Sequence, residues 1–347
     1  METVQVRETE IVQSLQSKYC ESPSPPVKIT QELSTEKLLT PAQWYPRVLA
    51  HKAEADKRTA AHVQRRKRGE KHPLEDFLYE YYPLRPRRFA NWHPGVTRQG
   101  EPIVLLKPCI DGGSSHAVDA LAAYEAQAKL PWYIEVETAK GFGLCLDLEF
   151  LKHREKGIKH LFRLHSMLLE REAIFGCLGW HEWAMVYRVD ETRHQLPLRL
   201  GQERTDELVE QAHIRCTHFD AFRFFAPEAA PLNQYQPSYE TVLANEQPGC
   251  IHVSMDILRS CLQLAPLVPG ELLIAAYDLA LQARTVDMAA SPYDCSSLGL
   301  VPISIETQAG KAQYIAAQRE LAIAAKPLRK KLVEILCAVN SRLERKF

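Results

Sequence analysis

The chain of 347 residues lacks net charge, since 43 Lys and Arg residues balance 43 Asp and Glu residues. This balance excludes a protein that coats nucleic acid with a uniformly basic surface, but it allows a basic face on a neutral body. Apolar runs of the roughly 18–20 residues that cross a bilayer are missing, as is the apolar segment of a secretion signal. We therefore expect no membrane partner.

The 9 cysteines form no recognisable metal or disulfide pattern. They are scattered over positions 20, 109, 145, 177, 216, 250, 261, 295 and 337 without a C-x-x-C pair. An odd number of scattered cysteines is typical of reduced thiols, so we expect a cytoplasmic protein. Internal repeats and an alternation of strands with helices are also missing, which argues against a Rossmann or barrel fold.

Hydrophobic residues make up 46% of the chain, which is enough for one or two domains with a sizeable core. A Pro- and Ser-rich start predicts a flexible N-terminal arm over residues 1–40. Residues 41–347 are expected to form a single, mainly helical domain. Within it we distinguish a basic part at 47–100, a polar-rich catalytic core at 176–295 and C-terminal helices at 308–347.

Apolar residues at spacings of three and four predict the helices. They cover 41–68, 73–82, 151–174, 204–211, 254–264, 270–288 and 308 to the C-terminus, the last with a break at Pro327. The first helix starts either at Pro41, behind a Thr40 cap, or at Pro46. Strand-like runs at 103–106, 132–136 and 144–148 predict a small sheet. The expected fold class is therefore α+β, predominantly α-helical with a small β-sheet.

Charge is distributed unevenly along the chain. Residues 47–100 hold 13 basic and 6 acidic residues, a balance of +7, whereas 101–150 hold 3 basic and 8 acidic residues, a balance of −5. The basic part interleaves arginines with tyrosines, which suits a polyanion with stackable bases. The alternative is a solvated helix end with tyrosines in the core. The candidate nucleic-acid contacts are Arg65, Arg66, Lys67, Arg68, Lys71, Arg85, Arg87 and Arg88.

Two central segments place polar groups in apolar surroundings. In the first, 179–188, His181 and Glu182 stand between two tryptophans, and Met185 excludes the H-E-x-x-H motif of zinc proteases. In the second, 215–225, an extended chain would project His218 and Asp220 from one face, as an oriented base or as two metal ligands. A hydrogen-bonded core histidine is the alternative at each place.

Two further segments carry candidate residues. His252 follows a Pro-Gly turn, with Asp256 four residues later, and Asp294 lies in a turn where it either caps the backbone or acts as a carboxylate. His181, His218 and His252 are the candidate ligands if a divalent metal is bound. Because their spacing matches no metal fingerprint, we predict no cofactor and keep the metal as an alternative.

Several motifs resemble a family of bacterial proteins, common in actinobacteria, that is labelled 3-methyladenine DNA glycosylase. The resemblance covers about residues 41–335. It is carried by Lys71-His-Pro-Leu-Glu-Asp-Phe-Leu-Tyr-Glu-Tyr-Tyr82, Trp92-His-Pro-Gly95, His181-Glu-Trp-Ala-Met-Val-Tyr-Arg188, His218-Phe-Asp-Ala-Phe-Arg-Phe-Phe225, Glu246-Gln-Pro-Gly-Cys250 and Ala290-Ser-Pro-Tyr-Asp294. The segment Leu267-Val-Pro-Gly-Glu271 lacks the second glycine of a helix-hairpin-helix motif and is interpreted as a helix start.

The resemblance implies an enzyme that hydrolyses the N-glycosidic bond of an alkylated purine in DNA, after flipping the nucleotide into an aromatic pocket. The catalytic candidates are Glu182, His218, Asp220, His252, Asp256 and Asp294. The substrate-binding candidates are Trp180, His181, Trp183, Tyr187, Arg223 and Tyr293, in which aromatic rings attract a cationic base.

Two other functional classes stay open. One is a metal-dependent hydrolase or oxygenase that acts on a small molecule through a His and carboxylate cluster, and the other is a non-catalytic binding module. The expected partner is DNA or a nucleoside-like substrate, and the sequence does not determine the oligomeric state.

Overall fold

The computed structural model describes residues 37–345, except for 83, 110–114 and 193. Its fold is mainly helical, with a four-stranded mixed sheet that is not closed into a barrel, so the α+β prediction is confirmed. The longer helices are α3 (Pro41–Lys67), α6 (Ser115–Ala128), α7 (Glu155–Glu170), α9 (Gly201–Gln211), α12 (Ile251–Leu264), α13 (Gly270–Ala290) and α14 (Gln308–Arg345). Short helices are α4 (Phe77–Glu80), α5 (Pro86–Phe89), α8 (Trp180–Ala184), α10 (Phe219–Phe222) and α11 (Val242–Asn245).

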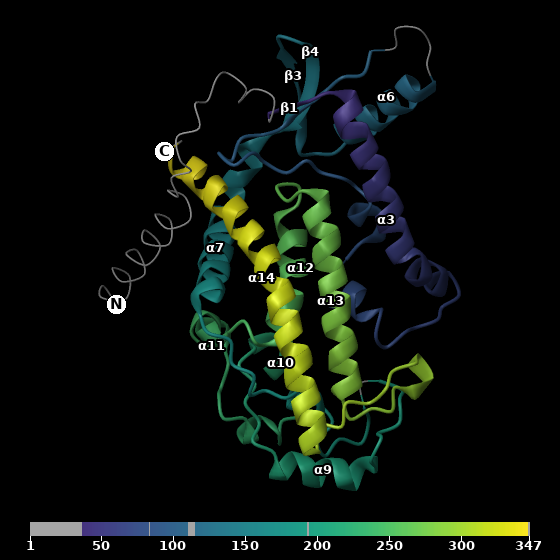
Figure 1. The fold of residues 1–347 in the computed structure, drawn as a ribbon, viewed down its shortest axis with the longest axis vertical. Helices are drawn as coiled ribbons and strands as arrows, with labels where there is room; N and C mark the ends of the chain where they lie inside the picture. The colour runs from purple at the N-terminus through teal and green to yellow at the C-terminus, as the bar shows by residue number, and fades with distance from the viewer. Residues whose placement is uncertain (1–36, 83, 110–114, 193, 346–347) are drawn as a thin grey trace.

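Helices α12, α13 and α14 form the centre of the helical part and lie beside one another in Figure 1. Helix α14 also packs along α7. Helix α13 is buried around most of its circumference, including Leu273, Ala276, Ala280 and Ala283. A helix that is apolar on nearly all sides is stable only inside other elements, so α13 must be surrounded. Its start at Gly270 confirms the interpretation of Leu267–Glu271 as a helix start.

Prolines do not interrupt the two longest helices. The predicted break at Pro327 is wrong, because α14 runs through it as one helix. Leu321 and Ala325 before the proline and Leu332 after it are all buried, and this packing outweighs the lost backbone hydrogen bond. Helix α3 likewise starts at Pro41 and contains Pro46, with Thr40 and Gln43 forming a capping box.

The sheet has the strand order β1 (Leu38–Leu39), β2 (Val104–Leu106), β4 (Gly141–Leu146) and β3 (Tyr133–Thr138). Strands β1 and β2 are parallel, and the other pairs are antiparallel. Three strands agree with the predicted runs, whereas β1 and α6 were not expected. The described end of the predicted arm, residues 37–40, therefore contributes a strand, and the rest of the arm lies outside the described residues.

Other predicted elements differ in extent. The helix predicted at 73–82 is only the short α4, and residues 215–225 contain the short helix α10 in place of a continuous strand. Within the described residues, short 3-10 helices lie at Leu148–His153, Ala230–Leu232, Tyr239–Thr241 and Ser296–Leu298. None of the described helices is both long and apolar enough to span a membrane.

Most of the described cysteines are free thiols, as expected from their scattering. The free cysteines are Cys109, Cys145, Cys177, Cys216, Cys250, Cys261 and Cys295. Cys337 in α14 is disulfide-bonded, so the expectation of reduced thiols throughout is wrong for this residue.

The loop before β2 contacts α14 through a glycine that tolerates no side chain. Gly100 has a φ of +73°, and a Cβ atom there would lie 2.4 Å from the Ala338 carbonyl oxygen. Gly69 has nearly the same φ, +71°, but a Cβ atom there would meet no atom within 4 Å. A side chain would therefore strain the backbone at both positions, but only at Gly100 would it also clash with α14.

We expect Gly69→Ala to lower the free energy of unfolding by about 1 kcal/mol, the strain of a left-handed residue. Gly100→Ala is expected to lower it by at least about 1–3 kcal/mol more, because the α14 backbone must also move. Urea denaturation followed by circular dichroism measures both values. Equal losses for the two variants would show that the loop does not press on α14.

Candidate functional site

A pocket with a volume of about 600 Å³ is lined by residues of α5, α10 and α12 and by the turn before α7. Its charged lining residues are Arg85, Arg88, Arg154, Arg223, Arg259 and Asp220. Its aromatic lining residues are Tyr81, Tyr82, Phe89, His93 and Trp132. Five arginines and one carboxylate line the pocket, so it is suited to an anionic ligand that also carries a flat ring.

Four separate chain segments bring these arginines together. Arg85 precedes the first turn of α5, which starts at a proline, and Arg88 follows within that helix. Arg154 binds the backbone carbonyl oxygens of Gln263 and Ala265 at 3.0 and 3.2 Å. Arg85 and Arg88 are exposed, and no other described side chain forms an ion pair with them. These two arginines are therefore available to a ligand.

Asp220 is the only carboxylate among the lining residues of this pocket. Its Oδ1 accepts from Nε of Arg223 at 2.9 Å, and its Oδ2 forms an ion pair with Nη1 of Arg259. The guanidinium of Arg259 also lies over the Tyr81 and Tyr82 rings, 5.3 and 5.2 Å from their centroids. These contacts fix the carboxylate on the pocket wall.

Asp256 lies directly behind this wall. Its carboxylate accepts from the Tyr82 hydroxyl at 3.0 Å, lies 3.2 Å from Nε2 of His218 and 3.5 Å from Nη1 of Arg259. Burial alone would raise the pKa of Asp256, but the His218 hydrogen bond and charge outweigh it and lower the pKa to about 2. Asp256 is therefore an ionised group that connects the pocket with the interior.

His218 has both ring nitrogens engaged. As N-cap of α10, its Nδ1 accepts from the Ala221 amide at 3.2 Å, while its Nε2 faces Asp256 and Oε1 of Glu246, which lies at 3.5 Å. Burial would lower the pKa of His218, but Glu246 and Asp256 raise it overall. Burial also raises the pKa of Glu246 to about 7.

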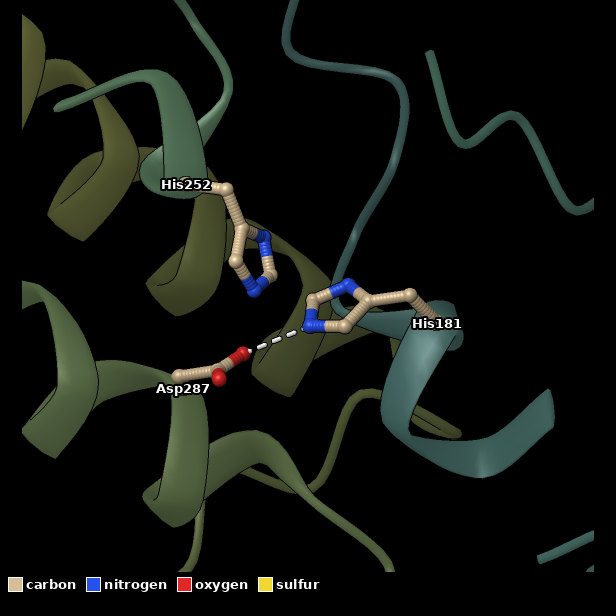
Figure 2. A group of neighbouring side chains, drawn as sticks. All are labelled: His181, His252 and Asp287. Carbon is tan, nitrogen blue, oxygen red and sulfur yellow. Dashed lines mark hydrogen bonds and ion pairs between the residues drawn. The ribbon is translucent and has the colours of Figure 1, made fainter. Parts of the chain in front are cut away.

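The ring of His252 connects His218 with a second polar cluster. It stacks on His218 at a centroid distance of 5.1 Å and meets the His181 ring edge-on at 4.6 Å. Nε2 of His181 in turn lies 2.7 Å from Oδ1 of Asp287 (Figure 2). His181, His252 and Asp287 are the described residues whose ligand atoms lie close enough, within 4.8 Å of one another, to hold a metal ion.

Arg284 balances the acidic side of this cluster. Its Nη1 donates to Glu182 at 2.7 Å and to Asp287 at 2.6 Å, and its guanidinium lies 4.3 Å from the Phe77 ring centroid. The side chain of Arg284 is 1% exposed. A charge so far from water is tolerated only because two carboxylates accompany it.

The protonation of the cluster follows from burial and charge. Burial would lower the pKa of His181, but the Asp287 carboxylate raises it well above its usual value. Burial and the neighbouring His181 lower the pKa of His252. Sγ of Cys177 lies 3.6 Å from Nδ1 of His181, and hydrogen bonds from Cys216 and then His181 lower the pKa of this thiol. His252 is thus a neutral imidazole between charged neighbours.

The structure brings only some of the predicted catalytic residues to the pocket. Asp220 lines it, whereas Asp256, His218 and His252 extend inward and Glu182 is buried beside Arg284. Asp294 lies elsewhere, where Oδ1 caps the amide of Ser296 at 2.9 Å. The extended chain considered for His218 and Asp220 stops at His218, because α10 begins at Phe219, and the two side chains bind different partners.

The predicted substrate-binding residues are divided in the same way. Arg223 lines the pocket, and His181 belongs to the buried cluster. The four aromatic candidates, Trp180, Trp183, Tyr187 and Tyr293, are all buried and are not among the lining residues. Trp183, for example, donates to the Ala290 carbonyl at 2.9 Å. Stacking on a ligand in this pocket would therefore involve other rings, such as Tyr81 and Trp132.

The predicted nucleic-acid contacts also separate into two groups. Arg85 and Arg88 line the pocket, whereas Arg65 to Arg68, Lys71 and Arg87 do not. Arg65 forms ion pairs with Glu75 and Asp76, and Arg68 with Glu70. Part of the basic charge at the end of α3 is thus neutralised within the chain.

Five residues of the site were not predicted from the sequence: Arg154, Arg259, Arg284, Asp287 and Glu246. A signal was present for three of them. Asp256 and Arg259 on α12, and Arg284 and Asp287 on α13, are opposite charges three residues apart within apolar helices. Such a pair on a buried helix indicates a polar site.

Comparisons with models of protein families, with curated proteins and with solved structures gave no match to this chain. The resemblance to the glycosylase family is a likeness of sequence motifs.

The buried Arg284 pair has a matched counterpart on the surface. Arg204 and Glu207 on α9 are also three residues apart with an N–O distance of 2.6 Å, like Arg284 and Asp287, but about half of each side chain is exposed. We expect Arg284→Met to lower the free energy of unfolding by about 3–5 kcal/mol, because two buried carboxylates lose their cation. Arg204→Met should change it little.

Chemical denaturation of both variants measures these effects. Adding Glu182→Gln to Arg284→Met should restore part of the loss, since one uncompensated charge is removed. If the buried and surface variants lost equal stability, the Arg284 network would not contribute in the way described.

Proposed function

We propose that the protein hydrolyses the N-glycosidic bond of an alkylated purine nucleotide unit, as in DNA, bound in the arginine-lined pocket. The supporting observation is that this pocket combines five arginines and several aromatic rings around one carboxylate, Asp220. The reaction type follows from the resemblance of the sequence motifs to 3-methyladenine DNA glycosylases.

Phosphate binding is assigned to Arg85 and Arg88. Both guanidinium groups are exposed and lack an ion-pair partner among the described side chains, so their donors can form bidentate hydrogen bonds with phosphate oxygens. Tyr81 and Trp132 are half-buried in the same lining and offer ring faces for a base. A nucleotide unit thus matches the pocket in both parts, because its phosphate can bind the arginines and its base can stack on the aromatic rings.

The charge of the pocket restricts how such a unit is oriented. An alkylated purine is itself a cation, so it is repelled by the guanidinium groups and attracted by aromatic faces. We therefore place the phosphates against the arginines and the base against the rings. A free nucleoside lacks the phosphate and should bind more weakly than a nucleotide or DNA.

Asp220 is assigned the catalytic role. As the bond between C1′ and the base nitrogen breaks, the electron pair leaves with the base, which departs neutral without needing a general acid. The sugar becomes an oxocarbenium-like cation, which a carboxylate stabilises. Water then adds to C1′ and gives its proton to Asp220 or to solvent. Arg223 and Arg259 hold the Asp220 carboxylate in place for this step.

The first test removes the charge of Asp220. Asp220→Asn is expected to lower kcat for release of free base from methylated DNA by about 10²–10³-fold, with the dissociation constant for DNA nearly unchanged. The matched control is Asp278→Asn, because Asp278 also binds an arginine, Arg58, at 2.7 Å but lies outside the pocket lining. Released base is quantified by chromatography, and binding by fluorescence anisotropy.

The outcomes separate the proposed classes. If the wild-type protein released no base from alkylated DNA, nucleotides or nucleosides, the glycosylase proposal would be wrong. Salt-sensitive binding without any release would instead support the non-catalytic binding module. Equal activity of Asp220→Asn and Asp278→Asn would show that Asp220 takes no part in the reaction.

A second test concerns the binding of phosphate. Arg85→Gln and Arg88→Gln should each weaken DNA binding and reduce the slope of log Kd against log salt concentration by about 1 for each phosphate that is no longer neutralised. The control pair is Arg66→Gln and Lys67→Gln, two exposed residues of the basic run that do not line the pocket. A larger change in the control pair would place the bound phosphates at the end of α3.

A further inference from the structure

The buried cluster of His181, His252 and Asp287 contains an imidazole without a hydrogen bond. Among the described residues, no donor or acceptor pairs with the ring nitrogens of His252, which is 6% exposed. The two histidines that contact its ring each have a bonded Nε2: that of His181 lies 2.7 Å from Asp287, and that of His218 lies 3.2 Å from Asp256. Both ring nitrogens of His252 are thus left without a partner in the part of the chain that the structure describes and are available to a ligand.

The orientation of His252 suggests what it binds. Figure 2 shows one ring nitrogen of His252 directed at the Asp287 carboxylate, next to the nitrogen of His181 that faces the same carboxylate. The three residues come from three elements, α8, the first turn of α12 and the last turn of α13. Their ligand atoms lie within 4.8 Å of one another.

We propose that His181, His252 and Asp287 bind one divalent transition-metal ion. Ligands at about 2.0–2.2 Å from such an ion lie roughly 3–4.4 Å apart, so small side-chain rotations complete the site. The ion would replace the hydrogen between His181 and Asp287. Two imidazole nitrogens and one carboxylate oxygen favour zinc, iron(II) or cobalt(II) over magnesium or calcium.

The groups around the three ligands fix their orientation. Oδ2 of Asp287 accepts from Arg284 at 2.6 Å, which leaves Oδ1 for the ion. Sγ of Cys177 lies 3.6 Å from Nδ1 of His181, which leaves Nε2 for the ion. Hydrogen bonds of this kind to the outer atoms of the ligands are usual at protein metal sites.

Charge also favours a cation at this place. The carboxylates of Glu182 and Asp287 carry two negative charges, and Arg284, bonded to both, carries one positive charge. Loss of the hydrogen between His181 and Asp287 on metal binding leaves the buried centre with an excess of one negative charge, which the bound cation compensates.

His218 is excluded as a ligand, in contrast to the set considered from sequence. Both of its ring nitrogens are engaged, one with the Ala221 amide and one with Asp256 and Glu246. Because it stacks on His252, it is a matched control for changes in packing. The proposal is independent of the reaction assigned to the pocket, because its test measures metal binding rather than activity.

The full-length protein, stripped with a chelator and dialysed, is titrated with Zn²⁺ by calorimetry and with Co²⁺ by visible absorption. We expect one ion per chain and d–d absorption bands from cobalt. His252→Gln should weaken binding at least 10-fold, whereas His218→Gln should keep the one-to-one stoichiometry. Circular dichroism and melting temperature verify that both variants are folded.

X-ray absorption of the zinc-loaded wild-type protein tests the ligands without any variant. The expected shell has two imidazole nitrogens, at least one oxygen and no sulfur. The proposal is overturned if Zn²⁺, Co²⁺, Fe²⁺ and Mn²⁺ all fail to bind stoichiometrically, or if folded His252→Gln binds as tightly as wild type. A sulfur ligand in the spectrum would also overturn it, since Cys177 would then belong to the site.

Discussion

The burial of Arg284 is the constraint on which the arrangement of the central helices depends. Its side chain is 1% exposed and lies on a largely buried helix, α13, so its charge must find carboxylates inside the protein. One comes from the same helix, Asp287, and the other, Glu182, from α8. Helix α8 is thereby held against α13 in one register, and His181, the neighbour of Glu182, is brought to Asp287.

The interior contains two similar units that meet at His252. In each, a central helix carries an acidic residue and an arginine three positions apart, and the acidic residue also contacts a histidine from another segment. The unit on α12 borders the pocket through Arg259, and the unit on α13 is closed. His252 touches the histidines of both units. Asp256, His218 and His252 thus form a continuous series of contacts from the pocket wall to the buried cluster.

Most of the longer helices and three of the four strands could be predicted from the sequence because they follow local apolar periodicity. The exceptions show where local signals fail. The break at Pro327 was predicted from the residue alone, although packing on both sides of α14 keeps that helix continuous. His218 and Asp220 were expected to act together, yet each binds a partner about forty residues away on α12. Such convergence depends on tertiary contacts that residue spacing does not encode.

The basic part of the sequence supplies only two of the five arginines that line the pocket, Arg85 and Arg88. The basic excess at 47–100 includes Arg65 and Arg68, which are paired with nearby acidic residues. The positive pocket also gathers arginines from distant segments, including Arg154 and Arg259. A chain without net charge can therefore hold a strongly positive cavity, because charge acts over a few ångströms in space and sequence windows average it over tens of residues.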